Sequence, residues 1–315
     1  MNWDELIHQL IQNTLVVAAA PLLLGWIGQC RAWLQNRRGA GVLQPYRNLA
    51  KLFQKDAVLA HNASPLFLLT PYIVFACMWL AAAMVPVAST DLPLCSAVDV
   101  IALVGVFALA RVFISLAAMD VGTAFGSLGA RREMLVGFLA EPALLMVLFT
   151  ATTISQSTSL VTIVEKLAHE QFALYPSMAF AAVAFLMVLL AENARIPVDN
   201  PSTHLELTMI HEAMILEYSA RHLALVEWAS ALKMFAYLTV GIALFLPWGI
   251  AGKGEWGDVP LALLLLCLKL AAAGAGLALL EALSAKLRIF RVPEFMGTAY
   301  LLAVLGLLTH FLLEA

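Results

Sequence analysis

The sequence predicts an all-α, polytopic membrane protein with about eight transmembrane helices. Hydrophobic residues make up 62% of the chain, charged residues only 12%, and the mean hydropathy is +0.89. A soluble domain is apolar over roughly half of its residues, so most of this chain must face lipid or other apolar helices. The apolar residues form continuous runs rather than an alternating pattern, which favours helices over the strands of a barrel.

Eight apolar runs are each long enough for a helix to cross roughly 30 Å of hydrocarbon, which takes about 20 residues. We expect them to form one integral membrane domain, residues 1–315. The expected helices are residues 10–33, 65–88, 97–119, 132–155, 176–195, 222–248, 258–284 and 294–313.

Basic residues gather on one side of the expected bundle. Four loops, with the helix ends beside them, carry 13 of the 18 Lys and Arg residues, whereas the opposite side carries only Lys166 and Lys253. The positive-inside rule then places the four loops in the cytoplasm and both termini on the outer side. On that outer side, Leu160 to Gln171 looks amphipathic and is expected to lie along the surface. The cytoplasmic loops are about residues 34–64, 120–131, 196–221 and 285–293.

Six charged residues fall within or near the ends of the apolar runs. An unpaired charge at the bilayer centre costs at least about 2.5 kcal/mol, so each needs an internal partner or water. Two interpretations stay open: ion pairs that fix helix packing, or a path in which bridging waters pass protons. For Glu141, eight residues after Glu133 and followed by Pro142, we favour a proton role. The six residues are Arg111, Glu133, Glu141, Lys233, Lys269 and Glu281.

The loop after the first run begins with a basic turn that contains glycine. It continues as a short amphipathic helix, with Leu49, Leu52 and Phe53 on one side and Arg47, Lys51 and Lys55 on the other. Such a segment is expected at the membrane interface, with its cations toward headgroups or an acidic partner.

Charge is densest after the fifth run. Seven of the 39 charged residues lie between Glu192 and Arg221. His204 and His211 lie in this stretch, seven residues apart. They could relay protons, because histidine titrates near neutral pH, or make structural hydrogen bonds. Metal binding would need a third ligand at suitable spacing.

The four cysteines are scattered and form no CxxC pair. Neither an iron-sulfur cluster nor a zinc site is therefore expected in this chain.

Four segments resemble the motifs of one family. RRGAGVLQPYRNLAKLF, from Arg37, resembles RRGPGVLQPYRDxxKL, and DVGTAFGSLGARREMLVGFLAEPAL, from Asp120, resembles LDTGSPFxxxGASREMxxxxxxEP. AENARIPVDNP, from Ala191, resembles AExNRxPFDLP, and EYS at Glu217 is the same. The chain is identified as a member of the family of membrane subunits that anchor the hydrophilic arm of energy-converting nickel-iron (NiFe) hydrogenases, of the formate-hydrogenlyase and hydrogenase-4 type. The H subunit of respiratory NADH:quinone oxidoreductase belongs to the same superfamily.

The resemblance implies a non-catalytic subunit without a redox centre, in a bacterial or archaeal cytoplasmic (inner) membrane. Iron-sulfur clusters and a NiFe centre would lie in partner subunits. The implied partners are a hydrophilic NiFe-type large subunit, a small iron-sulfur subunit, a ferredoxin-like subunit, antiporter-like membrane subunits and the lipid bilayer, and no nucleic acid.

The resemblance also implies a polar cavity that faces the arm, with Arg37, Arg38 and Arg195 on its rim. Its carboxylates would be Glu133, Glu141, Glu192, Asp199, Glu206 and Glu217. With the intramembrane charges and histidines, the expected proton path adds Glu212, His204, His211, Lys233, Lys269 and Glu281. The expected arm-docking residues are Arg37, Arg38, Arg47, Arg131, Arg132 and Arg195.

Departures from the motifs help to choose between the branches of the superfamily. The quinone branch has a longer loop, RRGPNRVGPxGLLQP, and two further carboxylates where this chain has Ser202 and His204. A quinone site of the usual kind is therefore not expected. Ala40, where both branches usually have Pro, indicates a divergent hydrogenase-like or hydrogenase-related complex. The alternatives are a quinone-site subunit and, since no internal repeat is seen, less favourably a free-standing ion transporter.

Overall fold

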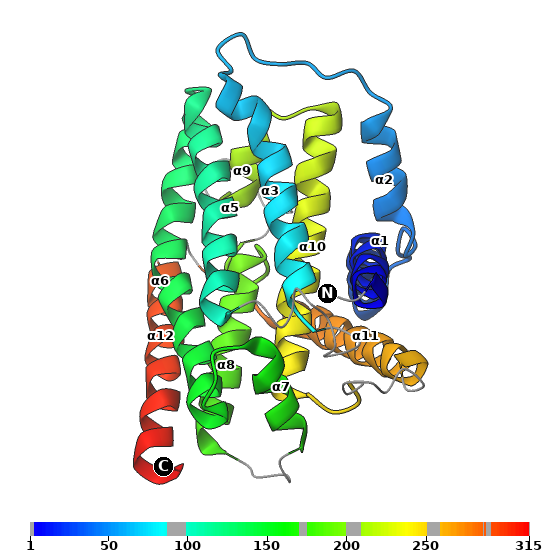
Figure 1. Cartoon of the computed structure of the whole chain (residues 1–315). Coiled ribbons are helices and arrows are strands. Elements are labelled where there is room, and N and C mark those ends of the chain that lie inside the picture. The colour runs from blue at the N-terminus through cyan, green and yellow to red at the C-terminus, as the bar shows by residue number, and fades with distance from the viewer. Residues whose placement is uncertain are drawn as a thin grey trace.

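The computed structural model describes residues 3–86, 99–169, 175–199, 209–250, 259–285, 287 and 291–314. Within these residues the regular elements are helices (Figure 1). They are α1 (Trp3–Leu34), α2 (Gln44–Phe53), α3 (Pro65–Met84), α5 (Val100–Asp120), α6 (Ala124–Ser155), α7 (Leu160–His169), α8 (Pro176–Glu192), α9 (His211–Ile215), α10 (Ala220–Phe245), α11 (Val259–Leu283) and α12 (Val292–Thr309), which continues as a π-helical turn (His310–Glu314).

The predicted all-α, polytopic membrane fold is confirmed. In the part of the chain described, seven helices are long and apolar enough to cross a membrane: α1, α3, α5, α6, α10, α11 and α12 with its extension. The eighth, α8, is apolar but has only 17 residues, at the lower end of the length that spans a bilayer.

Helix α6 begins at Ala124, well before the expected start at residue 132. Packing rather than hydropathy explains the difference, because small residues in this first part allow other segments to approach closely. A Cβ on Gly129 would lie 2.8 Å from the Cβ of Ala213 in α9, and one on Gly126 would lie 2.5 Å from the carbonyl oxygen of Ala118 in α5. The charged residues Arg131 and Arg132 therefore lie within a helix.

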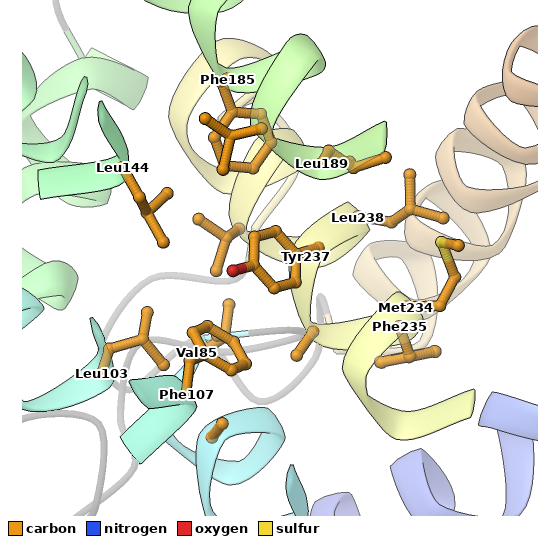
Figure 2. Packing of buried hydrophobic residues seen from close by; sticks show 14 of the residues in the cluster. Val85, Leu103, Phe107, Leu144, Phe185, Leu189, Met234, Phe235, Tyr237 and Leu238 are labelled. Carbon is orange, nitrogen blue, oxygen red and sulfur yellow. The ribbon is translucent and has the colours of Figure 1, made fainter. Parts of the chain in front are cut away.

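The helices form a bundle that α1 and α11 cross (Figure 1). Helices α3, α5, α6 and α10 run up the view of Figure 1, whereas α1 is seen end-on and packs against α11. The bundle core surrounds Tyr237 of α10, which is 1% exposed and stacks on Phe107 of α5 with ring centroids 4.7 Å apart. Phe185 and Leu189 of α8 and Leu144 of α6 complete this core (Figure 2).

Helix α7 is the segment expected to lie along the outer surface. In the structure, α7 packs against α6 and α10, so one of its faces contacts the bundle. Leu160, Ile163 and Val164 are buried there, and Lys166 donates hydrogen bonds to the carbonyls of Ile154 and Ser155 at the end of α6.

Hydrogen bonds join, in two pairs, the four loops that were expected on one side. The N–H of Ser64 donates to Asp120 at 2.9 Å, and the N–H of Leu287 donates to the carbonyl of Pro197 at 2.9 Å. We call this the loop end of the bundle. The orientation of the loop end toward the cytoplasm, and of both termini toward the outside, stays a prediction from the basic residues.

At the loop end, Tyr218 and Ser219 of the EYS segment bind Phe67 and Val58, in an arrangement that we call the EYS clamp. The Tyr218 ring stacks on Phe67 at 4.1 Å, and its hydroxyl donates to the Phe67 carbonyl at 3.1 Å. Burial raises the pKa of this hydroxyl, which keeps it a donor. Ser219 Oγ donates to the Val58 carbonyl at 2.7 Å and accepts from the Val58 N–H at 2.9 Å. The connection between α2 and α3 is thereby fixed to the start of α10.

The glycine-containing turn folds back on α1. The Gly41 N–H, at a φ of +93°, donates to Oε1 of Gln29 at 3.2 Å. A Cβ on Gly25 of α1 would lie 2.7 Å from the carbonyl carbon of Val42, so only glycine lets the turn lie this close. The amphipathic character of α2 is present, because Leu49 is buried while Arg47 and Lys51 are exposed.

Pro21 interrupts the backbone hydrogen bonds of α1. Proline has no N–H, so the carbonyl of Val17, four residues earlier, loses its helical partner. The indole Nε1 of Trp228 in α10 donates to this carbonyl at 3.0 Å, and the hydroxyl of Tyr46 in α2 donates to the next one, Ala18. The opened turn of α1 is therefore the point that holds both α2 and α10.

A double-mutant cycle tests this arrangement. Trp228→Phe should destabilise the full chain by about 1 to 3 kcal/mol, because a buried carbonyl loses its donor. In a Pro21→Ala background the backbone N–H of residue 21 can bond the Val17 carbonyl, so the same change should cost clearly less. Unfolding of the purified chain in detergent would measure both values. Equal costs in the two backgrounds would show that Trp228 does not replace the missing helical bond.

Candidate functional site: a charged cavity at the loop end

A cavity of about 810 Å³ lies below the loop end, bordered by residues of helices α1, α2, α3, α5, α6, α8, α9, α10 and α11. Part of its wall is apolar, with Leu24, Val74, Met78 and Phe107. Among the residues described, its charged lining contains both signs in similar number. These residues are Arg31, Arg37, Arg38, Arg111, Arg195, Lys233, Glu133, Glu192, Asp199, Glu212, Glu227 and Glu281, with His211 beside them.

Arg111 of α5 is the centre of the charged lining. Its three guanidinium nitrogens face three different carboxylates: Nε lies 3.3 Å from Glu133, Nη1 contacts Glu141 and Nη2 contacts Glu192. Lys233 of α10 lies 2.8 Å from the second oxygen of Glu192. We call these five residues the Arg111 cluster. Four helices, α5, α6, α8 and α10, meet through it.

The spacing in α6 explains how one arginine reaches two of these carboxylates. Glu133, Gly137 and Glu141 follow at intervals of four residues, so they lie along one stripe of the helix. A Cβ on Gly137 would lie 2.7 Å from Cδ of Arg111. The arginine therefore crosses α6 at the position without a side chain, with a glutamate on either side.

The centre of the Arg111 cluster is deeply buried, and the cluster as a whole is unbalanced in charge. Arg111 is 7% exposed, and Glu133 and Glu192 are 2% exposed each. Three carboxylates face two cations, so the cluster carries one formal negative charge. Removing one member of a buried ion pair typically costs about 3 to 5 kcal/mol, because its partner is left unpaired. The cluster therefore strongly constrains the packing of α5, α6, α8 and α10. It also lacks one positive charge for neutrality.

A second layer lies between the Arg111 cluster and the loop end. His211 Nε2 is 3.3 Å from Glu133, and His211 Nδ1 is 4.0 Å from Asp199. Asp199 accepts the backbone N–H groups of Ile210 at 3.2 Å and of His211 at 3.4 Å. Arg132 donates to the carbonyl of Met209 at 3.0 Å. The start of α9 is therefore held by side chains from both neighbouring segments.

Two further carboxylates face the cavity from α9 and α10. Burial raises the pKa of Glu212, and the charge of Asp199 raises it further, while His211 opposes both effects. Glu227 interacts with Glu212 across the cavity. Although the Glu212 side chain is exposed to the cavity, its carboxyl can hold a proton closer to neutral pH than a glutamate in bulk water does.

Glu281 and Lys269, both expected on the proton path, have different surroundings. Glu281 of α11 pairs with Arg195 at 3.1 Å and with Arg31 at 3.6 Å, and so joins α1 and α11 to the turn after α8. Lys269 donates to the carbonyls of Leu246, at 2.6 Å, and Trp248. These carbonyls follow the end of α10 that is farther from the loop end, so Lys269 closes a helix terminus and does not line the cavity.

Several other expected site residues lie outside the cavity lining. Glu141 contacts Arg111 but does not line the cavity, and 34% of its side chain is exposed on the isolated chain. Glu217, Arg47 and Arg131 are exposed. His204 and Glu206 fall in residues 200–208, outside the residues that the structure describes.

Arg111, Arg31 and Glu227 belong to the site but were not among the expected site residues. Arg111 was noted only as a charge inside an apolar run, and its partner Glu192 is 81 residues away. Glu227 also falls inside an expected run, at 222–248, so a search for every carboxylate in the apolar runs would have found it. Arg31 was counted only among the basic residues of the loops.

Gly137→Ala tests the placement of Arg111. The new methyl group should displace a guanidinium held by three carboxylates, and such overpacking typically costs about 1 to 3 kcal/mol. Gly105→Ala in α5 is the matched control, because a Cβ there has no neighbour within 4 Å; it should be neutral or stabilising by about 0.5 to 1 kcal/mol. Denaturant unfolding in detergent would compare the two, and equal stability would contradict this position for Arg111.

Known proteins resemble this chain over most of its length. Residues 7–312 match the family described as NADH dehydrogenase. Formate hydrogenlyase subunit 4 of Escherichia coli (strain K12) is 32% identical over 302 residues, which cover 96% of this chain and 97% of that protein. Hydrogenase-4 component C of the same organism is 33% identical over 246 residues, 78% of this chain and 76% of that protein.

More distant similarities agree with these matches. The H subunit of NADH-quinone oxidoreductase from Thermomicrobium roseum (strain ATCC 27502 / DSM 5159 / P-2) is 30% identical over 244 residues, 70% of each chain. A chain of the membrane-bound sulfane sulfur reductase, an archaeal respiratory membrane complex, has the same fold, with a TM-score of 0.83 at 18% identity over 97% of this chain and 99% of that one. The resemblance of the four sequence motifs is thereby confirmed, and the chain belongs to the NADH dehydrogenase family of multi-pass membrane proteins, with formate hydrogenlyase and hydrogenase-4 subunits among its relatives.

Proposed function

We propose that this chain is a membrane subunit of a respiratory-type, energy-converting complex of the hydrogenase or hydrogenase-related kind. It anchors a hydrophilic arm at the loop end and couples electron transfer in that arm to the translocation of protons or other ions. The observation that carries the proposal is the Arg111 cluster at the inner end of a large charged cavity. The similarity to formate hydrogenlyase subunit 4 over 96% of the chain supports the hydrogenase type.

The redox centres belong to the partners in this proposal. A hydrophilic NiFe-type large subunit, a small iron-sulfur subunit and a ferredoxin-like subunit form the arm, and antiporter-like subunits lie beside this chain in the membrane. The complex resides in a bacterial or archaeal cytoplasmic membrane, with the loop end toward the cytoplasm, where basic loops are favoured.

Exposed cations at the loop end support the anchoring role. Arg37 and Arg38 line the cavity next to its exposed turn and form no ion pair with the residues described. Unpaired surface charges of one sign steer and orient a partner of opposite charge. The hydrogen bond that the Gln29 side chain accepts from the Gly41 N–H, together with the EYS clamp, holds this surface in a fixed shape. A fixed shape reduces the entropy that docking would cost.

The Arg111 cluster supports the coupling role. Glu192 and Glu133 reach Arg111 from the cavity, whereas Glu141 reaches it from a partly exposed side of α6. The three carboxylates share one guanidinium, so neutralising a carboxylate on the cavity side strengthens the pairing of Arg111 with Glu141. Protonation of Glu133 or Glu192 on the cavity side thereby changes the electrostatic surroundings of Glu141. A neighbouring membrane subunit can reach Glu141, because its side chain is partly exposed.

A quinone-site subunit is the second candidate. The cavity volume falls in the range of roughly 300 to 1,000 Å³ that suits small-molecule ligands, and part of its wall is apolar. Reduction of an added quinone by the purified complex, abolished by substitutions in the cavity lining, would favour this candidate. Electron transfer that ignores added quinone would favour the hydrogenase-type role.

Removing the charges of Arg37 and Arg38 tests the anchoring role. The double variant Arg37→Gln/Arg38→Gln should hold the hydrophilic subunits several-fold more weakly, since exposed ion pairs contribute up to about 1 kcal/mol each. Co-purification across a series of salt concentrations would measure the loss. Lys166→Gln removes a charge from the other end of the bundle and should leave attachment unchanged. Normal co-purification of the double variant at every salt concentration would contradict the anchoring role.

Glu141→Gln tests the coupling role. The complex should still assemble, because the amide can accept a hydrogen bond from Arg111, but proton translocation should fall by roughly tenfold or more, since it loses a titrating group. Membrane vesicles with a pH-sensitive dye would report translocation, and a soluble electron acceptor would report electron transfer. Glu294→Gln in the exposed first turn of α12 is the control. Unchanged translocation with normal assembly would contradict a proton role for Glu141.

A further inference from the structure

His211 lies between two carboxylates that come from different segments. Its Nε2 is 3.3 Å from Oε2 of Glu133 in α6, and its Nδ1 is 4.0 Å from Oδ2 of Asp199 in the turn after α8. Both ring nitrogens are buried and lack a hydrogen-bond partner within the described part of the chain, although 27% of the side chain is exposed to the cavity. Each nitrogen therefore has a carboxylate oxygen within 4.0 Å.

This geometry suits an imidazolium better than a neutral ring. A neutral imidazole has one N–H and one lone pair, so one of its nitrogens would face a carboxylate with a lone pair. The doubly protonated ring has an N–H on each nitrogen and can donate to both. A proton on the ring therefore replaces a repulsive contact with an attractive one.

The charges around the ring favour the same state. Each oxygen of Glu133 has its own neighbour, since Oε1 faces Arg111 and Oε2 faces His211. The Arg111 cluster is one positive charge short, and an imidazolium beside it supplies that charge. Of the other groups near the ring, Asp199 and Glu212 are acidic, Glu227 interacts with Glu212 from α10, and Arg132 is held by the Met209 carbonyl.

The backbone that carries the ring is fixed by packing. Gly129 of α6 touches α9 so closely that a Cβ there would lie 2.9 Å from the Ile210 carbonyl oxygen. Asp199 accepts the N–H of His211 itself, so the backbone from which the ring extends is held from both sides. A group that transfers protons benefits from such a fixed position, because the transfer depends steeply on distance and direction.

We propose that His211 passes protons between Asp199, in the turn after α8, and Glu133 of the Arg111 cluster. The neutral ring, with its proton on Nε2, accepts a proton at Nδ1 from Asp199 and becomes an imidazolium. The Nε2 proton then moves to Glu133, and the ring is neutral again with its proton on Nδ1. One proton enters and one leaves, and a turn of the ring restores the first state. At 4.0 Å the Asp199 step uses a bridging water or a small shift of the carboxylate.

This inference rests on the proposed coupling function, and the intact complex in membrane vesicles can separate the two. His211→Gln should leave the arm attached and lower proton translocation by roughly tenfold or more, because a glutamine cannot carry a proton. His61→Gln, an exposed position outside the cavity lining, should match the wild type. A wild-type complex that moves no protons would refute the coupling function. A wild-type complex that does so, with an equally active His211→Gln variant, would refute only the role of His211.

A second measurement keeps His211 in place and so does not depend on the assembly of that variant. Glu212→Gln removes a negative charge beside the ring, which weakens proton binding at His211. The alkaline limb of the pH profile of translocation should therefore move to lower pH. An unshifted limb would overturn the proposal, and a lower rate at every pH without a shift would assign the transfer to Glu212 instead.

Discussion

The buried guanidinium of Arg111 constrains how the helices of this bundle pack. Arg111 would be costly inside an apolar core, and the structure offsets that cost with carboxylates from α6 and α8. Those carboxylates in turn require Lys233 and leave room for another positive charge. Because each member needs the others, the depth and rotation of four helices are coupled. Sliding one helix by a turn would leave charges unpaired in the core.

The walls of the cavity depend on a different kind of contact. Around the loop end, side chains bind backbone groups: Gln29 binds Gly41, Trp228 binds Val17 and Ser219 binds Val58. Such bonds have a direction, whereas apolar packing has almost none. A cavity lined with many charged side chains can therefore keep its shape within a membrane protein.

Hydropathy was sufficient to predict the long apolar helices, because a continuous apolar run within a membrane satisfies its backbone groups by forming a helix. It misplaced the start of α6, where close packing at Gly129 and not apolarity holds the helix. The stripe of Glu133 and Glu141 followed from spacing along one helix. The partners of Arg111 did not, since Glu192 is distant in the sequence and pairing between helices leaves no local pattern. Lys269 resembled the other intramembrane charges and proved to bind carbonyls at a helix end.

The EYS clamp has a consequence for how the protein is made. Val58 and Ser219 are 161 residues apart, so Val58 lacks this partner until Ser219 has been synthesised. At roughly 5 to 20 residues per second this interval is about ten to thirty seconds. The face at the loop end is thus completed late, after most of the chain has entered the membrane. Subunits that recognise this face in its final shape can join only after Ser219 has been synthesised, which imposes an order on biogenesis.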